Sequence, residues 1–369
     1  MGFLRFLLAL MVIFVHTGMG GDGRLAVETF YMISGFYMSL VWVDKYASHP
    51  NPIRTFYISR ALRIYPLYFI VLLGSVLMAL YLWQSTPQFT VSNPVETPLS
   101  WGAMLWVYMT QISLIGMEIS IFYGLHGYWI SPVAWTLGLE LTFYLLVPLL
   151  MPRPRLMLGI FIASLGARYV AYHQFSWQGN PDYASIWSYR FFPFEIALFL
   201  AGVFAHGILT KISDRLLVII TSLKFIILTV LVLTGAFGVH MLAHINFHKL
   251  LARLNIQAID LPFAQITDMQ YFWSEASYWC FYATVFFGII VLFQNTKRSK
   301  FDSKIGELSY PMYILHLPVI WFLLYVLTVA KLGNVIYFAV PITIMLAMLF
   351  SKIQKSIDDY RHMIIKNSA

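Results

Sequence analysis

Cysteine and charge are both scarce in this chain. The one cysteine, Cys280, excludes an intrachain disulfide and a metal site built from several cysteines. Charged residues make up 11% of the 369 residues, whereas about a quarter are charged in an ordinary soluble domain. A water-soluble globular domain is therefore excluded. The sequence also has no internal repeat, low-complexity tract or polar linker, so we predict a single membrane domain over 1–369.

Apolar and aromatic residues take the place of the missing charge. Hydrophobic residues make up 60% of the chain and aromatic residues 17%, and Tyr and Trp typically collect at the two membrane interfaces. Apolar runs long enough to cross about 30 Å of hydrocarbon recur along the sequence. We therefore predict an all-α polytopic membrane protein with about ten transmembrane helices. These lie near 3–19, 25–43, 64–83, 133–152, 156–173, 191–210, 222–241, 272–293, 309–330 and 334–351.

The first apolar run has some features of a signal peptide, with Arg5 before it and glycines after it. A second apolar run follows almost at once, and an A-x-A-like cleavage site is missing. We therefore expect the first run to remain as a transmembrane helix.

One further apolar stretch, 101–123, decides the topology. Its polar residues are Thr110, Gln111, Ser113 and Glu118. If the stretch is re-entrant or interfacial, most of the 24 Lys and Arg residues fall on one side of the membrane, as the positive-inside rule favours. We therefore predict ten spans with both termini cytoplasmic, and a full eleventh crossing remains the alternative. The outward loops would be 84–132, 174–190 and 242–271. The net charge of +8 then follows the cytoplasmic loops and implies no nucleic-acid partner.

Arg5 and His16 share one face of the first predicted helix. Eleven residues separate them, which is about three helical turns and about 16 Å along the axis. Ionisable groups inside a membrane span usually mark a functional site. A short loop then leads to Glu28 at the start of the second helix, so we expect an imidazole–carboxylate pair between His16 and Glu28. Such a carboxylate orients a histidine and stabilises its cation.

Arg60 and Arg63 form an R-x-x-R motif at the start of the third predicted helix. At this spacing both side chains point the same way. Two guanidinium groups can grip phosphate oxygens, although ordinary interfacial anchoring explains the spacing equally well.

Several segments occur in a characteristic order along the whole chain. They are R-x10-H (Arg5, His16), AVETFYMISGF (26–36), RALRIYPLY (60–68), WTLGLELTFY (135–144), FLAGVFA (199–205) and SYPMYILH (309–316). In this order they resemble the membrane acyltransferase-3 family, the integral-membrane O-acyltransferases that decorate bacterial glycans. There are two departures from the family pattern. Gly138 stands where Ser or Val is commoner, and the usual Asp-Gly-Leu-Arg before the first span is Met-Gly-Phe-Leu-Arg here.

The resemblance implies a chemistry and a setting. The donor substrate would be cytoplasmic acyl-CoA, with acetyl-CoA expected from its prevalence in the family, and no cofactor would be permanently bound. The acceptor would be a hydroxyl of a glycan or lipid-linked saccharide, and the protein would lie in the lipid bilayer of a bacterial inner membrane. His16 would be catalytic, and Arg5, Arg60 and Arg63 would bind the donor.

The expected mechanism starts at His16. Oriented by Glu28, it would remove the proton of the acceptor hydroxyl, and the alkoxide would attack the thioester. A two-step route through an acylated His16 fits the sequence as well. Substrate binding or pocket shaping is assigned to Trp135, Glu140, Tyr310 and His316. Structural support is the favoured role of Glu140, and a helix–helix hydrogen bond is the favoured role of His316.

Other polar residues carry less weight. Some lie in or near the predicted outer loops and could contact a sugar, although a wet interfacial surface explains each of them more simply. They are Glu118, His126, Arg190, Glu195, Asp260, Asp268 and Glu275, with Trp101, Trp129, Trp177 and Trp273 as stacking faces. Three histidines spaced by four, His240, His244 and His248, have no acidic neighbour, and no metal site is predicted there.

A polytopic transporter or flippase of a glycan precursor is the alternative function. Buried charges and many spans suit it. The Gly- and Pro-interrupted segments that would mark two inverted halves are not found in the sequence.

Overall fold

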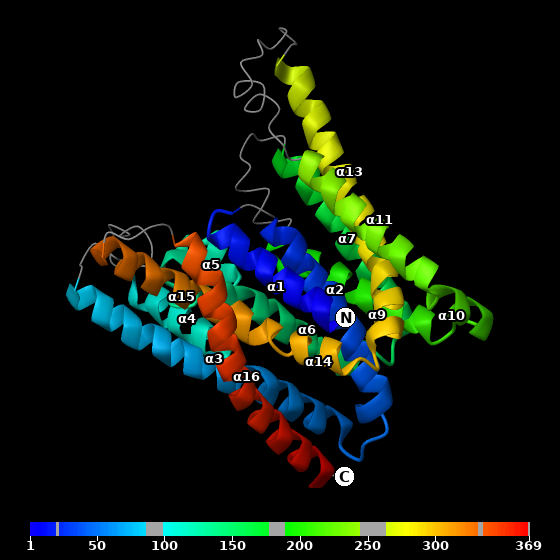
Figure 1. The fold of residues 1–369 in the computed structure, drawn as a ribbon, viewed down its shortest axis with the longest axis horizontal. Coiled ribbons are helices and arrows are strands. Elements are labelled where there is room, and N and C mark those ends of the chain that lie inside the picture. The colour runs from blue at the N-terminus through cyan, green and yellow to red at the C-terminus, as the bar shows by residue number, and fades with distance from the viewer. Residues whose placement is uncertain (20–21, 86–98, 177–188, 244–262, 331–334, 368–369) are drawn as a thin grey trace. The chain divides into compact units, whose positions relative to one another are not determined.

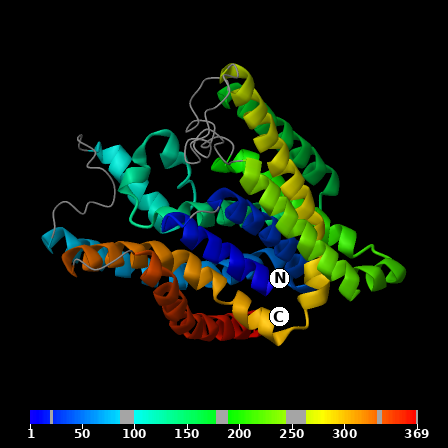
Figure 2. The same ribbon diagram turned by 45° about the horizontal axis from the view of Figure 1, so that its top comes forward.

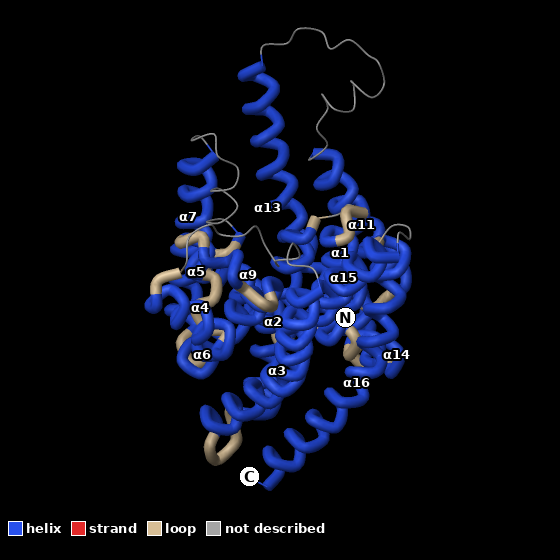
Figure 3. Tube along the Cα trace, turned by 90° about the vertical axis from the view of Figure 1, so that its left-hand side faces the viewer, coloured by secondary structure: helices blue, strands red, loops and turns tan. Residues whose placement is uncertain are grey.

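The computed structural model describes residues 1–369 except for 20–21, 86–98, 177–188, 244–262, 331–334 and 368–369. No strand occurs in the described part of the chain, and its regular structure is helical (Figure 3). The predicted all-α fold is therefore confirmed. Two compact units are present. The large unit comprises Gly2–His206 and Lys300–Ala369, and the small unit comprises Met1 and Gly207–Ser299.

The large unit contains most of the helices. Their bounds are α1 (Gly2–His16), α2 (Gly23–Val41), α3 (Pro52–Ser85), α4 (Trp101–Ser113), α5 (Ile119–Phe122), α6 (Trp135–Leu150), α7 (Pro154–Ser176), α14 (Lys300–Gly306), α15 (Ser309–Ala330) and α16 (Ile336–Asn367). The unit boundary falls near the end of α9 (Phe192–Leu209). The small unit contains α10 (Asp214–Ile220), α11 (Leu223–Ala243) and α13 (Phe263–Thr296), and α11 packs along α13.

The chain is a polytopic membrane protein. Among the described residues, seven helices are long and apolar enough to cross a membrane, and the bent pair α10 and α11 makes an eighth if it counts as one span. All ten predicted segments fall on helices. The two predicted segments outside this set are α1, which has 15 residues, and α7.

The stretch 101–123 does not cross as one helix. Its first part, α4, has 13 residues and extends about 20 Å, which is short of about 30 Å of hydrocarbon. Leu114 then takes a positive φ of 65° and ends the helix. Two tyrosines of α3 hold this end: Tyr68 donates a hydrogen bond to the Gln111 carbonyl at 2.6 Å, and Tyr65 donates to the Ser113 carbonyl at 2.5 Å. The broken helix agrees with the predicted re-entrant or interfacial segment.

The Leu114 turn also explains a departure from the family pattern. Gly138 of α6 lies against it, and a Cβ at this position would overlap the Leu114 carbonyl oxygen. A serine or valine here would push the turn away from α6. Glycine at position 138 therefore fits the way in which 101–123 packs in this chain.

Helix α1 lies at the centre of the large unit and packs against α2, α14, α15 and α16 (Figure 1). Its apolar face buries Ala9 and Ile13 against Met312 of α15 and Ala347 of α16. Helix α16 in turn packs along α15 and α3 (Figure 2). This packing fixes both ends of α1: Arg5 near its start and His16 at its end.

Close approach of α2 to α9 depends on two glycines. A Cβ at Gly35 would overlap the carbonyl oxygen of Phe199, and a Cβ at Gly202 would overlap that of Met32. Small residues let helix backbones touch in membranes. Glu28 on α2 is thereby held beside Glu195 on α9, where both are fully buried.

Candidate active site

His16 lies beside a second histidine that is far away in the sequence. The Nε2 atom of His316, on α15, lies 3.2 Å from Nδ1 of His16, and the ring centroids are 5.0 Å apart. His16 Nδ1 also lies 2.9 Å from the carbonyl oxygen of Val12, one turn earlier in α1. His316 is completely buried.

The hydrogen bonds of this pair determine which nitrogens carry protons. A carbonyl oxygen only accepts, so His316 Nδ1, 2.7 Å from the Tyr313 carbonyl, carries a proton. In the neutral ring His316 Nε2 is then an acceptor, and it faces His16 Nδ1. The proton of His16 Nδ1 is therefore shared between His316 Nε2 and the Val12 carbonyl. The lone pair of neutral His16 lies on Nε2, as a general base requires.

Glu28 does not make the predicted contact with His16. Its Oε1 atom forms ion pairs with Arg24, at 3.1 Å, and with Arg168 of α7. Arg168 also holds Glu195 at 2.9 Å. Buried guanidinium groups bind carboxylates through strong charge-assisted hydrogen bonds, so these arginines take the carboxylate that the α1–α2 hairpin was expected to offer to the imidazole. Arg168 was not singled out in the sequence, because its partners lie on two other helices.

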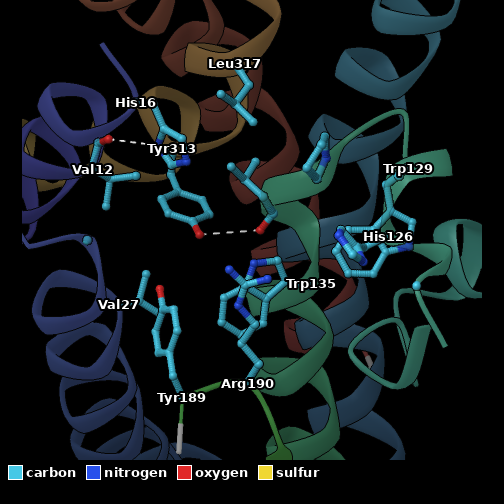
Figure 4. Close-up of a pocket in the computed structure, with 15 residues that line it drawn as sticks. Val12, His16, Val27, His126, Trp129, Trp135, Tyr189, Arg190, Tyr313 and Leu317 are labelled. Carbon is cyan, nitrogen blue, oxygen red and sulfur yellow. Dashed lines mark hydrogen bonds between the residues drawn. The ribbon is translucent and has the colours of Figure 1, made fainter. Parts of the chain in front are cut away.

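His16 lines a pocket of about 450 Å³. Figure 4 shows His16 and Leu317 at one end and Arg190, Trp135 and Tyr189 at the other. His126 and Trp129 line it as well. Trp135 lines this pocket, and its role in substrate binding stays a prediction. Tyr313, between the two ends, is fixed by a 2.8 Å hydrogen bond with Thr136.

His126 lies in the connection between α5 and α6, where burial and a nearby charge both lower its pKa. The pKa of His126 lies below its ordinary value because the ring is partly buried, and the positive charge of Arg190 lowers it further. His126 is thus neutral at physiological pH and can accept or donate a hydrogen bond.

The three predicted donor-binding arginines lie in the large unit, away from the residues that line this pocket. Arg60 is 8% exposed, and its Nη2 atom contacts Ser59 at 3.1 Å and Tyr46 at 3.4 Å. The rings of Phe56, Tyr46 and Tyr144 surround the guanidinium at 5.7–6.0 Å. Within the described residues no carboxylate pairs with it. The charge of Arg60 is therefore buried among rings and hydroxyl groups.

Arg5 and Arg63 differ in their partners. The guanidinium of Arg5 lies 5.5 Å from the centroid of the Tyr37 ring. Its Nε atom is buried, and no described residue forms a hydrogen bond with it. Arg63 instead pairs with Asp358 of α16 at 3.1 Å. Arg63 is close enough to Arg5 for the two positive charges to interact.

A fourth guanidinium, on α16, completes the group. Arg361 of α16 is 8% exposed and shares Asp358 with Arg63, at 3.0 Å. Its charge interacts with those of Arg60 and Arg63. We call Arg5, Arg60, Arg63 and Arg361 the arginine cluster. The only hint of it in the sequence was the pair Asp358 and Arg361 at helical spacing after an apolar run.

Glu140 and Tyr310, two further residues singled out in the sequence, form hydrogen bonds between helices. Glu140 accepts hydrogen bonds from Ser34 of α2, at 2.8 Å, and from Tyr144. Tyr310 of α15 donates a 2.7 Å hydrogen bond to the Ile64 carbonyl of α3. Both contacts tie neighbouring helices together.

No metal site is found among the described residues: no group of three or more His, Cys, Asp or Glu side chains is placed to hold an ion. His244 and His248 lie outside the described residues, as does the side chain of His240.

A family model described as an acyltransferase domain matches residues 1–352. The chain belongs to the acyltransferase 3 family. It is therefore an acyltransferase, which decides against the transporter alternative. No curated protein and no solved structure matches the chain. The family match ends before Asp358 and Arg361, although the structure brings both residues to Arg63.

Proposed function

We propose that this acyltransferase moves an acyl group, acetyl by preference, from acyl-CoA to a hydroxyl group of a saccharide. His16 is the general base in this proposal. The observation that carries it is the proton arrangement of the histidine pair, in which Nδ1 of His16 is committed to Val12 and His316 and Nε2 keeps its lone pair. The pocket that His16 lines has aromatic walls, which suit a sugar ring.

The arginine cluster is the proposed site for the phosphates of the donor. In the described part of the chain, two of the four guanidinium groups, Arg63 and Arg361, share one carboxylate partner, Asp358, and none of the described ion pairs includes Arg5 or Arg60. Arg60 and Arg361 are buried, and Arg5 and Arg63 are partly buried. Cations removed from water are costly unless an anion compensates them, and a guanidinium group can bind two phosphate oxygens at once. The thioester arm would extend from the cluster along α1, whose axis covers about 16 Å between Arg5 and His16.

The chemical steps follow from these positions. His16 Nε2 takes the proton of the acceptor hydroxyl as its oxygen attacks the thioester carbonyl carbon. The new carbon–oxygen bond forms, the carbon–sulfur bond breaks, and the proton on Nε2 passes to the leaving thiolate. While the imidazole is a cation, its Nδ1 proton is stabilised by His316 Nε2 and the Val12 carbonyl. In this role His316 replaces the predicted Glu28.

We place the arginine cluster on the cytoplasmic side of a bacterial inner membrane, with the His16 pocket toward the other face. The concentration of Lys and Arg in the loops predicted to be cytoplasmic supports this orientation. Acyl-CoA is then met on the side where it is made, and the acceptor on the opposite side.

Purified protein in lipid nanodiscs, supplied with radiolabelled acetyl-CoA and a glycan acceptor, tests the proposal. His16→Gln should abolish transfer while CoA binding, measured separately, stays intact. His49→Gln removes an imidazole elsewhere in the large unit and should transfer normally. Substantial transfer by His16→Gln would refute the role of His16. Label bound to the protein in the absence of acceptor would show that His16 is acylated first.

A further inference from the structure

Among the described residues, Arg190 has no counter-ion; it lies at the far end of the pocket from His16 (Figure 4). Its guanidinium lies 5.4 Å from the centroid of the Trp135 ring and 5.7 Å from that of Tyr189. The Nε atom is buried and has no hydrogen-bond partner among the described residues. None of the ion pairs among the described residues includes Arg190. The aromatic rings therefore hold the planar group in place and leave its N–H donors for something else.

The rest of the pocket does not supply an anion. The described residues that line it include Arg190, His16 and His126, and neither Asp nor Glu is among them. The two buried carboxylates of the neighbouring helices, Glu28 and Glu195, are engaged by Arg168. The pocket thus carries a positive charge that the described protein does not neutralise.

Arg24 lies near Arg190 but, unlike Arg190, is paired with a carboxylate among the described residues. It also lies over the Tyr189 ring, at 5.9 Å, but its Nε atom is paired with Glu28 at 3.1 Å. Two arginines flank Tyr189, and within the described part of the chain Arg190, which lines the pocket, has no carboxylate partner. A partly desolvated guanidinium is expensive unless an anion reaches it, so the missing partner should belong to the molecule that enters the pocket.

We propose that the acceptor is an anionic saccharide, and that Arg190 binds its charged group while His16 meets its hydroxyl. This inference rests on the proposed function. The recognised chemistry is an oxyanion group that accepts two parallel N–H donors, as a sugar carboxylate or a sugar phosphate does. The pocket of about 450 Å³ lies within the usual range for small-ligand sites. The faces of Trp135 and Tyr189 then hold the guanidinium, and the sugar ring meets the other aromatic walls of the pocket, Trp129 and Tyr313.

The test compares matched acceptors on wild-type protein in nanodiscs. Methyl glucuronoside, methyl glucoside and methyl glucoside 6-phosphate are offered with acetyl-CoA, and both binding and transfer are measured. We expect one or both anionic sugars to bind at least about tenfold more tightly than the neutral sugar, since a hydrogen bond to a charged group contributes about 1.5–3 kcal/mol. Comparing methyl glucuronoside with methyl glucoside 6-phosphate shows whether the site prefers a carboxylate or a phosphate.

Arg190→Gln should remove this preference. It should weaken binding of the anionic sugar by about 10- to 100-fold and leave the neutral sugar unchanged. Arg155→Gln removes the same charge from an exposed position on α7 and should change neither. The inference would be overturned if wild-type protein bound neutral and anionic sugars equally tightly. It would also be overturned if Arg190→Gln weakened the binding of both sugars by the same factor. If Arg190→Gln lowered the transfer rate equally for both sugars, Arg190 would instead stabilise the oxyanion that forms during the reaction.

The two proposals fail in different ways. If anionic sugars bind through Arg190 but acetyl-CoA never acylates them or any extracted glycan, the proposed function is wrong and the inference about the pocket stands. If transfer occurs with neutral sugars only, the proposed function stands and the inference is wrong.

Discussion

The Nε2 atom of His316 lies 3.2 Å from Nδ1 of His16, across the interface of α15 and α1. A neutral histidine thus occupies the position that an acidic residue holds in a serine-protease triad. An acidic partner would add a charge to a fully buried place, which is costly. A histidine held by the Tyr313 carbonyl accepts the same proton without that charge.

His316 should therefore be a positioning residue for His16. His316→Leu removes the acceptor and should lower kcat by about 10²- to 10⁴-fold, the usual contribution of a general base. The KM for acetyl-CoA should change little, because the arginine cluster is untouched. His316→Gln can place its amide oxygen near the lost Nε2 atom and should restore much of kcat. Steady-state kinetics on the two variants measure the difference; equal losses in both would indicate a purely structural role.

Arg361 should contribute to donor binding although it lies beyond the family match. Asp358 holds Arg63 and Arg361 together, and a donor phosphate would compete for the same guanidinium groups. Arg361→Gln should raise the KM for acetyl-CoA by about tenfold or more with a smaller effect on kcat. Arg298→Gln, in the small unit, serves as the control. An unchanged KM would return Arg361 to the role of an interfacial anchor.

The network of Arg24, Glu28, Arg168 and Glu195 should support stability. Arg168→Leu leaves two buried carboxylates without their shared partner, and breaking a buried pair in this way costs about 3–5 kcal/mol. A clear fall in the thermal midpoint in detergent is expected. Glu28→Gln should also lower the midpoint, but the folded protein should keep kcat within about tenfold, because His16 takes its orientation from His316. Loss of kcat without loss of stability would restore the catalytic role predicted for Glu28.

Local sequence patterns predicted the helices well. The apolar runs all became helices, because runs of this length and hydropathy are stable in a bilayer only as helices with internally satisfied backbones. The separation of Arg5 and His16 by about three turns follows from helical geometry alone. Trp135 is the first residue of the motif WTLGLELTFY and of α6, and this start of α6 lies at the pocket.

Contacts between side chains far apart in the chain could not be predicted from local sequence patterns. Glu28 was assigned to His16 because they lie across one hairpin, but Arg168, 140 residues later, forms a stronger buried ion pair with it. The contact between His16 and His316 spans 300 residues, and no periodicity reports such a distance. The burial of Arg361 depends on α16 packing along α3, which a local pattern does not report.

Gly138 offers a test of how closely the broken segment 101–123 is coupled to the pocket. Serine at this position places a Cβ on the Leu114 carbonyl oxygen, and overpacking of this kind costs about 1–3 kcal/mol. Because α6 also begins with Trp135 at the pocket, moving the Leu114 turn should disturb the pocket wall. Gly138→Ser should therefore lower the thermal midpoint and raise the KM for the acceptor more than that for acetyl-CoA. Gly159→Ser adds the same atoms to α7, where a Cβ meets open space, and should leave both constants unchanged. If the two variants behave alike, Gly138 has no special packing role, and the turn at Leu114 is free to move without consequence for acceptor binding.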